Sequence, residues 1–167
     1  GREAAWIRFN TLNRGDAVKI LDNLNNIVKV QQTAEFHKKF DGHSAIIVCP
    51  GPSLAKNIDT LKEAKGKILI ICVLHAFRAL KKAGITPDIV IHTDPFSLKN
   101  LYFERDGQEK SQWDEWIESN DFSDVQYFIT SSMGSPAMFN IPTKKILWMS
   151  PGQKVGAHLP IDVYDYN

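Results

Sequence analysis

Short apolar segments that alternate with amphipathic ones constrain the fold of this chain more than any other feature. Residues 44–49 and 67–73 are nearly continuous apolar runs between turn residues, which is typical of strands buried on both faces of a sheet. Residues 54–64 and 75–83 follow them with the apolar spacing of helices. This alternation predicts βαβ units and an α/β fold with a mostly parallel sheet and flanking helices. Further strands are predicted at residues 88–94, 125–130 and 145–149, and a helical turn at residues 135–139.

The segment before the first strand is predicted to be helical. A short helix is expected at residues 2–10, and a second one begins after Asp16, which is a good N-cap. Its apolar residues recur on one face, which we expect to pack against the protein, and it should end before Asp41 and Gly42. The chain thus divides into a helical lead-in, residues 1–41, and an α/β domain, residues 42–167. The apolar face consists of Ala17, Ile20, Leu21, Leu24, Ile27 and Val28.

Charge and composition argue against several classes of protein. Twenty Lys and Arg residues against 19 Asp and Glu residues give a net charge of +1, which disfavours a polybasic groove for nucleic acid. The longest apolar run, residues 68–74, is too short to cross a bilayer. Cys49 and Cys72 lie in apolar runs without metal-binding spacing, so both are predicted to be reduced core residues. These features predict a cytoplasmic protein without a membrane span.

The turn after the first predicted strand is a candidate phosphate site. Gly51 allows a close approach to the backbone, and Pro52 suits the start of a helix. Ser53 either caps that helix or donates its hydroxyl to a ligand oxygen. The N–H groups of residues 51–54, ending at Leu54, would lie at a helix N-terminus, where an anion is stabilised. An ordinary strand–helix turn with a serine cap is the alternative interpretation.

Polar residues also follow the third and fourth predicted strands. In open α/β sheets, ligands bind at the carboxyl ends of the strands, near the point where strand order reverses. Thr93 and Asp94 end the third strand, and a carboxylate there coordinates Mg²⁺, binds a ribose, acts as a base or merely shapes a turn. Thr130, Ser131 and Ser132 end the fourth strand and either bind phosphate or sugar or cap the turn.

Three histidines lie in or after the predicted elements near this site. His92 belongs to the third strand and is predicted to be a buried core residue. His75 begins the helix after the second strand, where it would face a ligand. His158 is a candidate general base in a predicted C-terminal loop.

Residues 40–95 resemble the core of the MptE-like domain family, which includes motility-associated-factor (Maf) flagellin glycosyltransferases and archaeal 6-hydroxymethylpterin diphosphokinases. The resemblance rests on Gly-Pro-Ser-Leu at residues 51–54, and on Gly-Ile-Thr-Pro-Asp at residues 84–88 before a strand that ends in Asp94 and Pro95. The first of these turns is also similar to that of bacterial sialyltransferases that use CMP-activated sugars. The resemblance implies a Rossmann-like sheet that holds a nucleotide with Gly51, Pro52, Ser53 and Asp94.

The chain also departs from the family pattern. Pro50 replaces a small residue, and Leu74 and His75 stand where the family tends to have an asparagine, so the contacts to ribose or sugar are expected to differ. The glycine-rich strand–helix segment of the family would come after Asn167. We therefore expect the nucleotide-binding domain, residues 42–167, to be incomplete at its C-terminus.

The resemblance implies a nucleotide-dependent transferase. The preferred function is that of a Maf-like glycosyltransferase, which moves a nonulosonic (sialic- or pseudaminic-type) sugar from a CMP donor to a hydroxyl of a protein such as flagellin. In that reaction Asp94 and His158 are the candidate catalytic residues, and no metal is obligatory. The alternative is a 6-hydroxymethylpterin diphosphokinase that uses ATP, with Mg²⁺ on Asp94. A third possibility is a nucleotide-binding or scaffold domain of a larger protein without catalysis.

Overall fold

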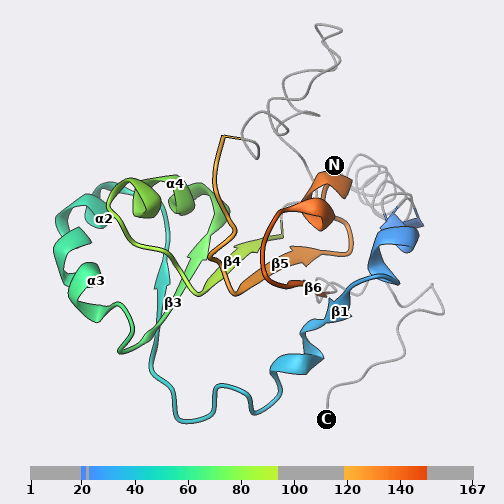
Figure 1. Cartoon of the computed structure of the whole chain (residues 1–167), viewed down its shortest axis with the longest axis horizontal. Helices are drawn as coiled ribbons and strands as arrows, with labels where there is room; N and C mark the ends of the chain where they lie inside the picture. Colours follow the sequence, from blue (N-terminus) through green and yellow to red (C-terminus); the bar gives the residue numbers. More distant parts are fainter. Residues whose placement is uncertain (1–19, 22, 94–118, 150–167) are drawn as a thin grey trace, which may run out of the picture.

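A single parallel sheet forms the centre of the protein (Figure 1). The computed structural model describes residues 20–21, 23–93 and 119–149. Within them six strands lie in the order β1-β6-β5-β4-β3-β2, and every neighbouring pair is parallel. The predicted α/β class is thereby confirmed, and the arrangement is Rossmann-like. The strands are β1 (Gln31–Gln32), β2 (Ala45–Val48), β3 (Leu69–Val73), β4 (Ile89–His92), β5 (Tyr127–Ser131) and β6 (Ile146–Met149).

The helices between the strands follow the predicted pattern. The predicted helix at residues 54–64 consists of α2 (Pro52–Lys56) and α3 (Ile58–Ala64), which meet at Asn57. The next one is α4 (Leu74–Lys82), which ends in a Schellman motif: the Ile85 N–H donates to the Leu80 carbonyl, and Gly84 adopts φ 76°. The expected turn at residues 135–139 is the 3₁₀ helix η2 (Pro136–Asn140).

The two faces of the sheet are covered differently. Helices α2, α3 and α4 lie over one face and pack on residues such as Cys72, Val90 and Phe128 (Figure 1). Phe36 and Phe40, from the segment that joins β1 to β2, pack on the opposite face. That segment begins with the 3₁₀ helix η1 (Thr33–Phe36). The core of the opposite face contains Ile89, Ile129 and Leu147.

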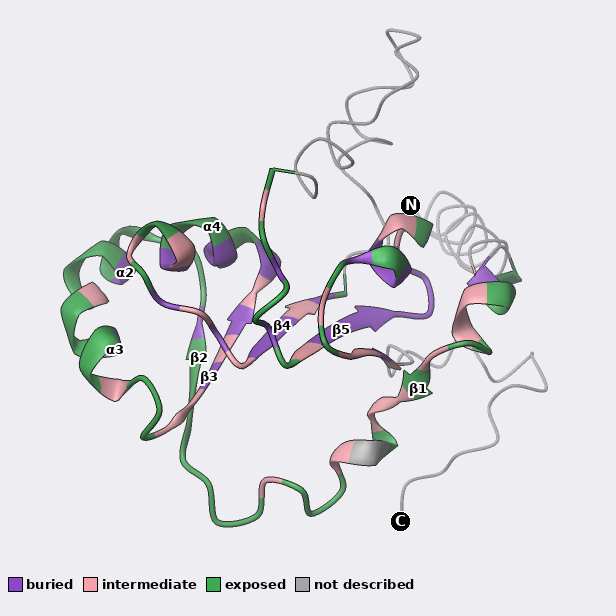
Figure 2. Cartoon of the chain, in the orientation of Figure 1, coloured by how far each residue is buried: buried purple, intermediate pink, exposed green. Residues whose placement is uncertain are grey.

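β2 departs from its prediction as a strand buried on both faces. It forms one edge of the described sheet, and three of its four residues are exposed (Figure 2). The side chain of Ile47 is 71% exposed, and only Val48 is buried. The prediction was wrong here because no described residue pairs with the outer side of this strand or covers Ile47.

The lead-in segment also differs from its prediction. Its described helix ends at Ile27, before Asp41 as predicted, but the rest of the predicted helical lead-in is not helical throughout, since β1 follows at residues 31–32 and pairs with β6. Leu21, Leu24 and Val28 are exposed, whereas Asn23 is 1% exposed. The helix therefore buries the Asn23 side chain against the protein, while these three residues of its predicted apolar face stay exposed. The domain boundary after residue 41 stays a prediction, and residues 2–10 lie outside the described part.

One of the two cysteines lies in the core, as predicted, and the other does not. Cys72 is buried, as predicted, whereas Cys49 is exposed at the end of β2, so its assignment to the core was wrong. No helix in the described part of the chain is long and apolar enough to cross a membrane.

Candidate functional site

Strand register aligns the predicted site residues at one edge of the sheet. Val48 pairs with Cys72, Ile91 with Ile129, and His92 with Thr130, so the strands end at nearly the same level. The Gly51 turn, His75 and Thr93 follow β2, β3 and β4, and the hydroxyl run at residues 130–132 starts with the last two residues of β5. Since neighbouring strands are about 4.8 Å apart, the ends of β2 and β4 are roughly 10 Å apart, and β5 lies one strand farther.

The Gly51 turn is open on its outer side. Gly51 is the N-cap of α2 with extended backbone angles (φ 160°, ψ 170°), and a Cβ placed on it meets no atom within 4 Å. Pro52 occupies the first turn, as predicted. The N-cap of α2 is Gly51, and Ser53 is an exposed residue of the first turn, so the predicted serine cap was wrong. Pro52 lacks an N–H, and the Leu54 N–H donates to the Gly51 carbonyl (3.1 Å), so the N–H groups of Gly51 and Ser53 are the two in this turn without a backbone acceptor among the described residues.

Leu54 is a packing residue of this turn. Its side chain is buried in the core between the helices and the sheet. Asn57, which joins α2 to α3, stabilises the turn, since its Nδ2 donates to the Ser53 carbonyl at 2.8 Å. The backbone of residues 51–54 is thus held in place while the Ser53 side chain stays accessible.

The start of α4 provides a second helix N-terminus at the same edge. Neither α2 nor α4 carries an acidic residue in its first turn, and neither has a side-chain cap, which leaves both termini favourable for an anion. His75 is exposed on the first turn of α4, and its ring centroid lies 6.3 Å from that of His92. His92 is buried, as predicted.

The hydroxyl run at the end of β5 is buried. Thr130, Ser131 and Ser132 are all enclosed, and Thr130 Oγ1 has no hydrogen-bond partner among the residues that the structure describes. Ser131 Oγ accepts the Met133 N–H at 3.1 Å, so this hydroxyl shapes the turn. A Cβ on Gly134 would lie 2.7 Å from Thr130 Oγ1, which explains why glycine follows Met133.

Asn23 fixes this turn from a distant part of the chain. Its Nδ2 donates to the carbonyl of Ser132 at 3.1 Å and to that of Gly134 at 2.7 Å. Because both carbonyls are tied to one buried amide, the turn has a defined conformation. Sequence reasoning missed Asn23, although an amide within an apolar helical stripe is a usable signal.

Asp94 and His158, the two predicted catalytic residues, lie outside the described residues, whereas Thr93 is exposed directly after β4. No cluster of His, Cys, Asp and Glu that could hold a metal occurs in residues 20–93 and 119–149, apart from the undescribed residue 22. At the carboxyl ends of the strands, the exposed described groups are therefore the side chains of Ser53, His75 and Thr93 and two helix N-termini. These groups suit a ligand that carries both an anionic group and hydroxyl groups.

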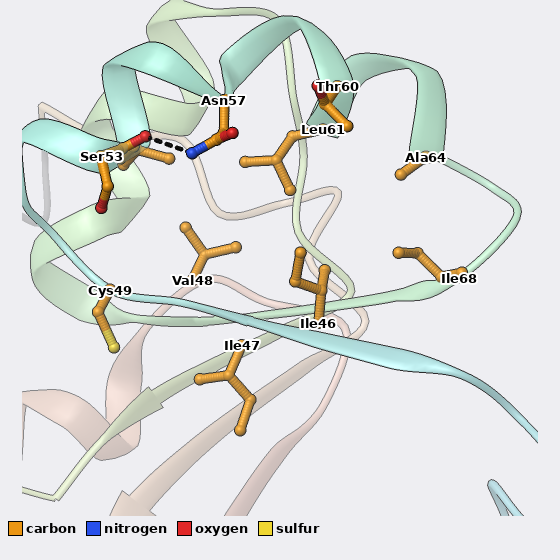
Figure 3. A pocket seen from close by; sticks show the side chains of 11 residues that line it. Ile46, Ile47, Val48, Cys49, Ser53, Asn57, Thr60, Leu61, Ala64 and Ile68 are labelled. Carbon is orange, nitrogen blue, oxygen red and sulfur yellow. Dashed lines mark hydrogen bonds between the residues drawn. The ribbon is translucent and has the colours of Figure 1, made fainter.

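A cavity of about 290 Å³ adjoins the Gly51 turn (Figure 3). It lies between β2 and helices α2 and α3, and it reaches the turn through Ser53 and Leu54, with Cys49 beside them. Most of its lining is apolar, with Asn57 and Thr60 among the exceptions. The phosphate site predicted from the sequence is thus open surface, and the neighbouring cavity suits apolar groups.

The comparisons with known proteins agree with this architecture. The family model described as 6-hydroxymethylpterin diphosphokinase MptE-like matches residues 19–155. The chain belongs to the MptE-like family. No curated protein sequence matches it.

A solved structure shares the fold of this MptE-like chain. It is the Maf glycosyltransferase from Magnetospirillum magneticum AMB-1, with a TM-score of 0.55 and 16% sequence identity. The match covers 80% of the present chain but 18% of that protein. The chain therefore corresponds to a small part of the Maf structure.

Proposed function

We propose that this MptE-like chain is the nucleotide-binding part of a glycosyltransferase that uses a CMP-activated nonulosonic sugar and glycosylates a protein hydroxyl, with flagellin as a candidate acceptor. The observation that carries the proposal is the Gly51 turn at the carboxyl end of β2, where the Ser53 side chain is exposed and the N–H groups of Gly51 and Ser53 have no backbone acceptor among the described residues. Ligands bind at this edge in open α/β sheets. Membership in the family and the fold shared with a Maf glycosyltransferase support a transferase of this kind.

The chemistry requires the protein to stabilise a leaving phosphate. The N–H groups of Gly51 and Ser53 and the N-terminus of α4 supply partial positive charge without a metal ion. His75, exposed on the first turn of α4, adds a group that is able to accept a proton or hydrogen-bond a hydroxyl. Asp94, which follows β4, keeps its sequence-based assignment as a catalytic residue, as does His158.

The family description favours one alternative, a 6-hydroxymethylpterin diphosphokinase. That reaction would use ATP with Mg²⁺ held by Asp94, and a diphosphate would pass to the pterin hydroxymethyl group. A nucleotide-binding or scaffold domain that has lost catalysis is the remaining candidate.

A thermal-shift panel tests the proposal. CMP, CDP, ATP and GTP are added with and without Mg²⁺, and a ligand at a hundredfold excess over its Kd stabilises the protein by about 2.7 kcal/mol. A metal-independent shift with CMP or CDP supports the glycosyltransferase, and a shift with ATP that requires Mg²⁺ supports the diphosphokinase instead. Absence of any shift contradicts both.

Two serine variants locate the site. Ser53→Ala should reduce the CMP-induced shift, because Ser53 lies at the outer face of the turn. Ser44→Ala is the matched control, since Ser44 is also exposed but precedes β2 at the opposite end of the strand. Equal shifts in the two variants would place the nucleotide elsewhere.

A further inference from the structure

Thr130 carries a buried hydroxyl that no other described residue uses. The side chain is fully buried, and its Oγ1 has no hydrogen-bond partner among the residues that the structure describes. Burying an unpaired hydroxyl costs free energy, and a valine, which has nearly the same shape, would avoid that cost. The hydroxyl therefore calls for a partner, and its position in the sheet indicates which kind of group would fit.

The strand register places this hydroxyl at the edge of the sheet where ligands bind. Thr130 pairs with His92 at the carboxyl end of β4. Because side chains alternate along a strand, Thr130 lies on the same face as Phe128, which is the face that α2, α3 and α4 cover. The Gly51 turn begins α2 over this face, three strands away, at roughly 14 Å. A nucleotide sugar with its phosphate at the Gly51 turn is long enough to bring a sugar hydroxyl to Thr130.

The turn at residues 131–134 closes over the Thr130 hydroxyl. A Cβ on Gly134 would lie 2.7 Å from Oγ1, so the backbone of Gly134 lies directly against the hydroxyl. The Gly134 N–H donates to the Ser131 carbonyl at 2.9 Å, and the Met133 N–H donates to Ser131 Oγ at 3.1 Å, which makes the turn a compact unit. The end of β5 and this turn are buried (Figure 2). A ligand therefore reaches the hydroxyl once the turn moves away from it.

Asn23 holds the turn in this closed position. Its Nδ2 donates to the Ser132 carbonyl at 3.1 Å and to the Gly134 carbonyl at 2.7 Å. These two acceptors lie on either side of Met133, so one amide fixes both halves of the turn. The N-terminal helix that carries Asn23 lies beside the turn (Figure 1).

The described part of this helix is attached to the protein mainly through that amide. Among residues 20–21 and 23–27, Asn23 is the one buried residue, whereas Leu21 and Leu24 are exposed. Helices with few buried apolar contacts belong to the less stable parts of a protein, from which binding loops and lids are drawn. A movement of the helix would release both carbonyls together and free the turn.

We propose that residues 131–134 form a lid over a ligand-binding hydroxyl, that of Thr130, and that Asn23 is the latch that keeps the lid closed. The ligand group is a sugar hydroxyl of a nucleotide sugar, which forms a hydrogen bond with Oγ1 after the lid opens. This choice of ligand rests on the proposed function, whereas the latch rests on the described contacts alone. Because the ligand binds the open form, the closed lid lowers its apparent affinity.

Thiol labelling tests the latch without any nucleotide. Thr130→Cys places a thiol beneath the lid, in a Cys49→Ser background that removes the exposed native thiol. Adding Asn23→Ala should speed labelling at residue 130 tenfold or more, whereas Asn26→Ala should not, because its amide contacts only Asn23. The buried Cys72 reports unfolding of the whole protein, so its labelling should stay slow. Equal rates at residue 130 with and without the Asn23 amide would overturn the latch.

Amide exchange provides the same test without a cysteine substitution. The amides of Met133 and Gly134 should exchange at least tenfold faster in Asn23→Ala than in the unsubstituted protein, while that of Ile129 in β5 keeps its rate. Unchanged rates at Met133 and Gly134 would overturn the latch. An equal acceleration at Ile129 would also overturn it, since the turn would then open only together with the sheet.

Nucleotide titration tests the ligand. CMP and a CMP-activated sialic acid are titrated into the unsubstituted protein, into Asn23→Ala, and into Asn23→Ala combined with Thr130→Val. Opening the lid should tighten binding about tenfold, and Thr130→Val should remove this gain. A gain with both ligands assigns the hydroxyl to the ribose, and a gain with the sialic acid conjugate alone assigns it to the transferred sugar.

Two results would overturn the ligand assignment. Equal affinities with threonine and valine at residue 130 would mean that the hydroxyl contacts neither sugar. If neither nucleotide binds any of the three proteins, the proposed function and the ligand assignment fail together. The latch is then still decided by the labelling and exchange measurements, which contain no nucleotide.

Discussion

Gly51 and Gly84 are glycines for different reasons. Gly84 has φ 76°, a conformation that side chains disfavour, at the end of α4. Gly51 is extended and has free space where a Cβ would lie. Nothing in the described chain requires glycine at residue 51, and the free space beside it leaves the backbone of the turn open to a ligand.

The two positions give a matched pair of substitutions. Gly51→Ala should change the free energy of unfolding by less than about 0.5 kcal/mol, while weakening nucleotide binding roughly tenfold, because a methyl group would lie between the turn and the phosphate. Gly84→Ala should cost about 1 kcal/mol and leave binding unchanged. Urea unfolding and nucleotide titration measure both. Unaltered affinity in Gly51→Ala would contradict a phosphate at this turn.

The two cysteines should differ in reactivity. Burial, with a smaller contribution from Cys49, raises the pKa of Cys72 to about 12, so its thiolate is scarce at pH 8. Cys49 is exposed. A thiol reagent at pH 8 should therefore label one cysteine per native chain and two after unfolding in urea. Cys49→Ser should abolish the native signal, and rapid labelling of two thiols in the native protein would contradict the burial of Cys72.

At the scale of elements, Asp88 connects three strands at the end of the sheet opposite the candidate site. Its Oδ2 accepts the Ile70 N–H at 2.8 Å, its own N–H donates to the Ile70 carbonyl at 2.9 Å, and its carbonyl accepts the Tyr127 N–H at 3.1 Å. The aspartate of Gly-Ile-Thr-Pro-Asp is thus a structural residue that sets how β3, β4 and β5 begin.

Removing this carboxylate should destabilise the sheet without changing the ligand site. Asp88→Ala leaves the Ile70 N–H without its acceptor, which costs about 1–3 kcal/mol. Asp59→Ala is the control, because Asp59 forms an exposed pair with Lys62 at 3.2 Å that is worth less than about 1 kcal/mol. Urea denaturation measures the difference. A loss of nucleotide binding in folded Asp88→Ala would contradict a purely structural role.

Strands and helix ends that depend only on neighbouring residues in the sequence were predictable. The five strands with apolar runs, the end of α4 at Gly84 and the start of α2 at Pro52 depend on neighbouring residues, and they lie within a few residues of their predicted bounds. β1 was not predictable, because a two-residue strand has no periodicity and exists only through its pairing with β6. The exposure of β2 could not be predicted either, since a sequence does not show which strand lacks a neighbour.

The candidate site was predictable only in part. Strand ends identified the edge and the Gly51 turn, but the burial of Thr130, Ser131 and Ser132 depends on how the following turn folds back over them. Asn23 reaches that turn across more than a hundred residues of sequence. Contacts of such separation leave no regular spacing in a single sequence.

At the scale of the whole molecule, Asn23 joins the N-terminal helix to the β5 side of the sheet. Asn23→Ala should lower the free energy of unfolding by about 2 kcal/mol, because it leaves two carbonyls without their donor. Asn26→Ala should cost less than about 0.5 kcal/mol, since its amide makes one 3.4 Å contact, to Asn23 itself. Chemical denaturation of both variants measures this. Equal losses would mean that the helix is not anchored through Asn23.

The pairing of β1 with β6 has a consequence for synthesis. Gln31 lies beside Leu147, so the first described strand to leave the ribosome has as its partner the last one. The intervening strands can assemble in order, each beside the one made just before it. The N-terminal helix, whose Asn23 binds the turn after β5, must wait as well. Until translation has passed residue 149, β5 lacks its neighbour β6 on one side. Its free backbone groups would then be able to pair with another nascent chain, which leads to aggregation.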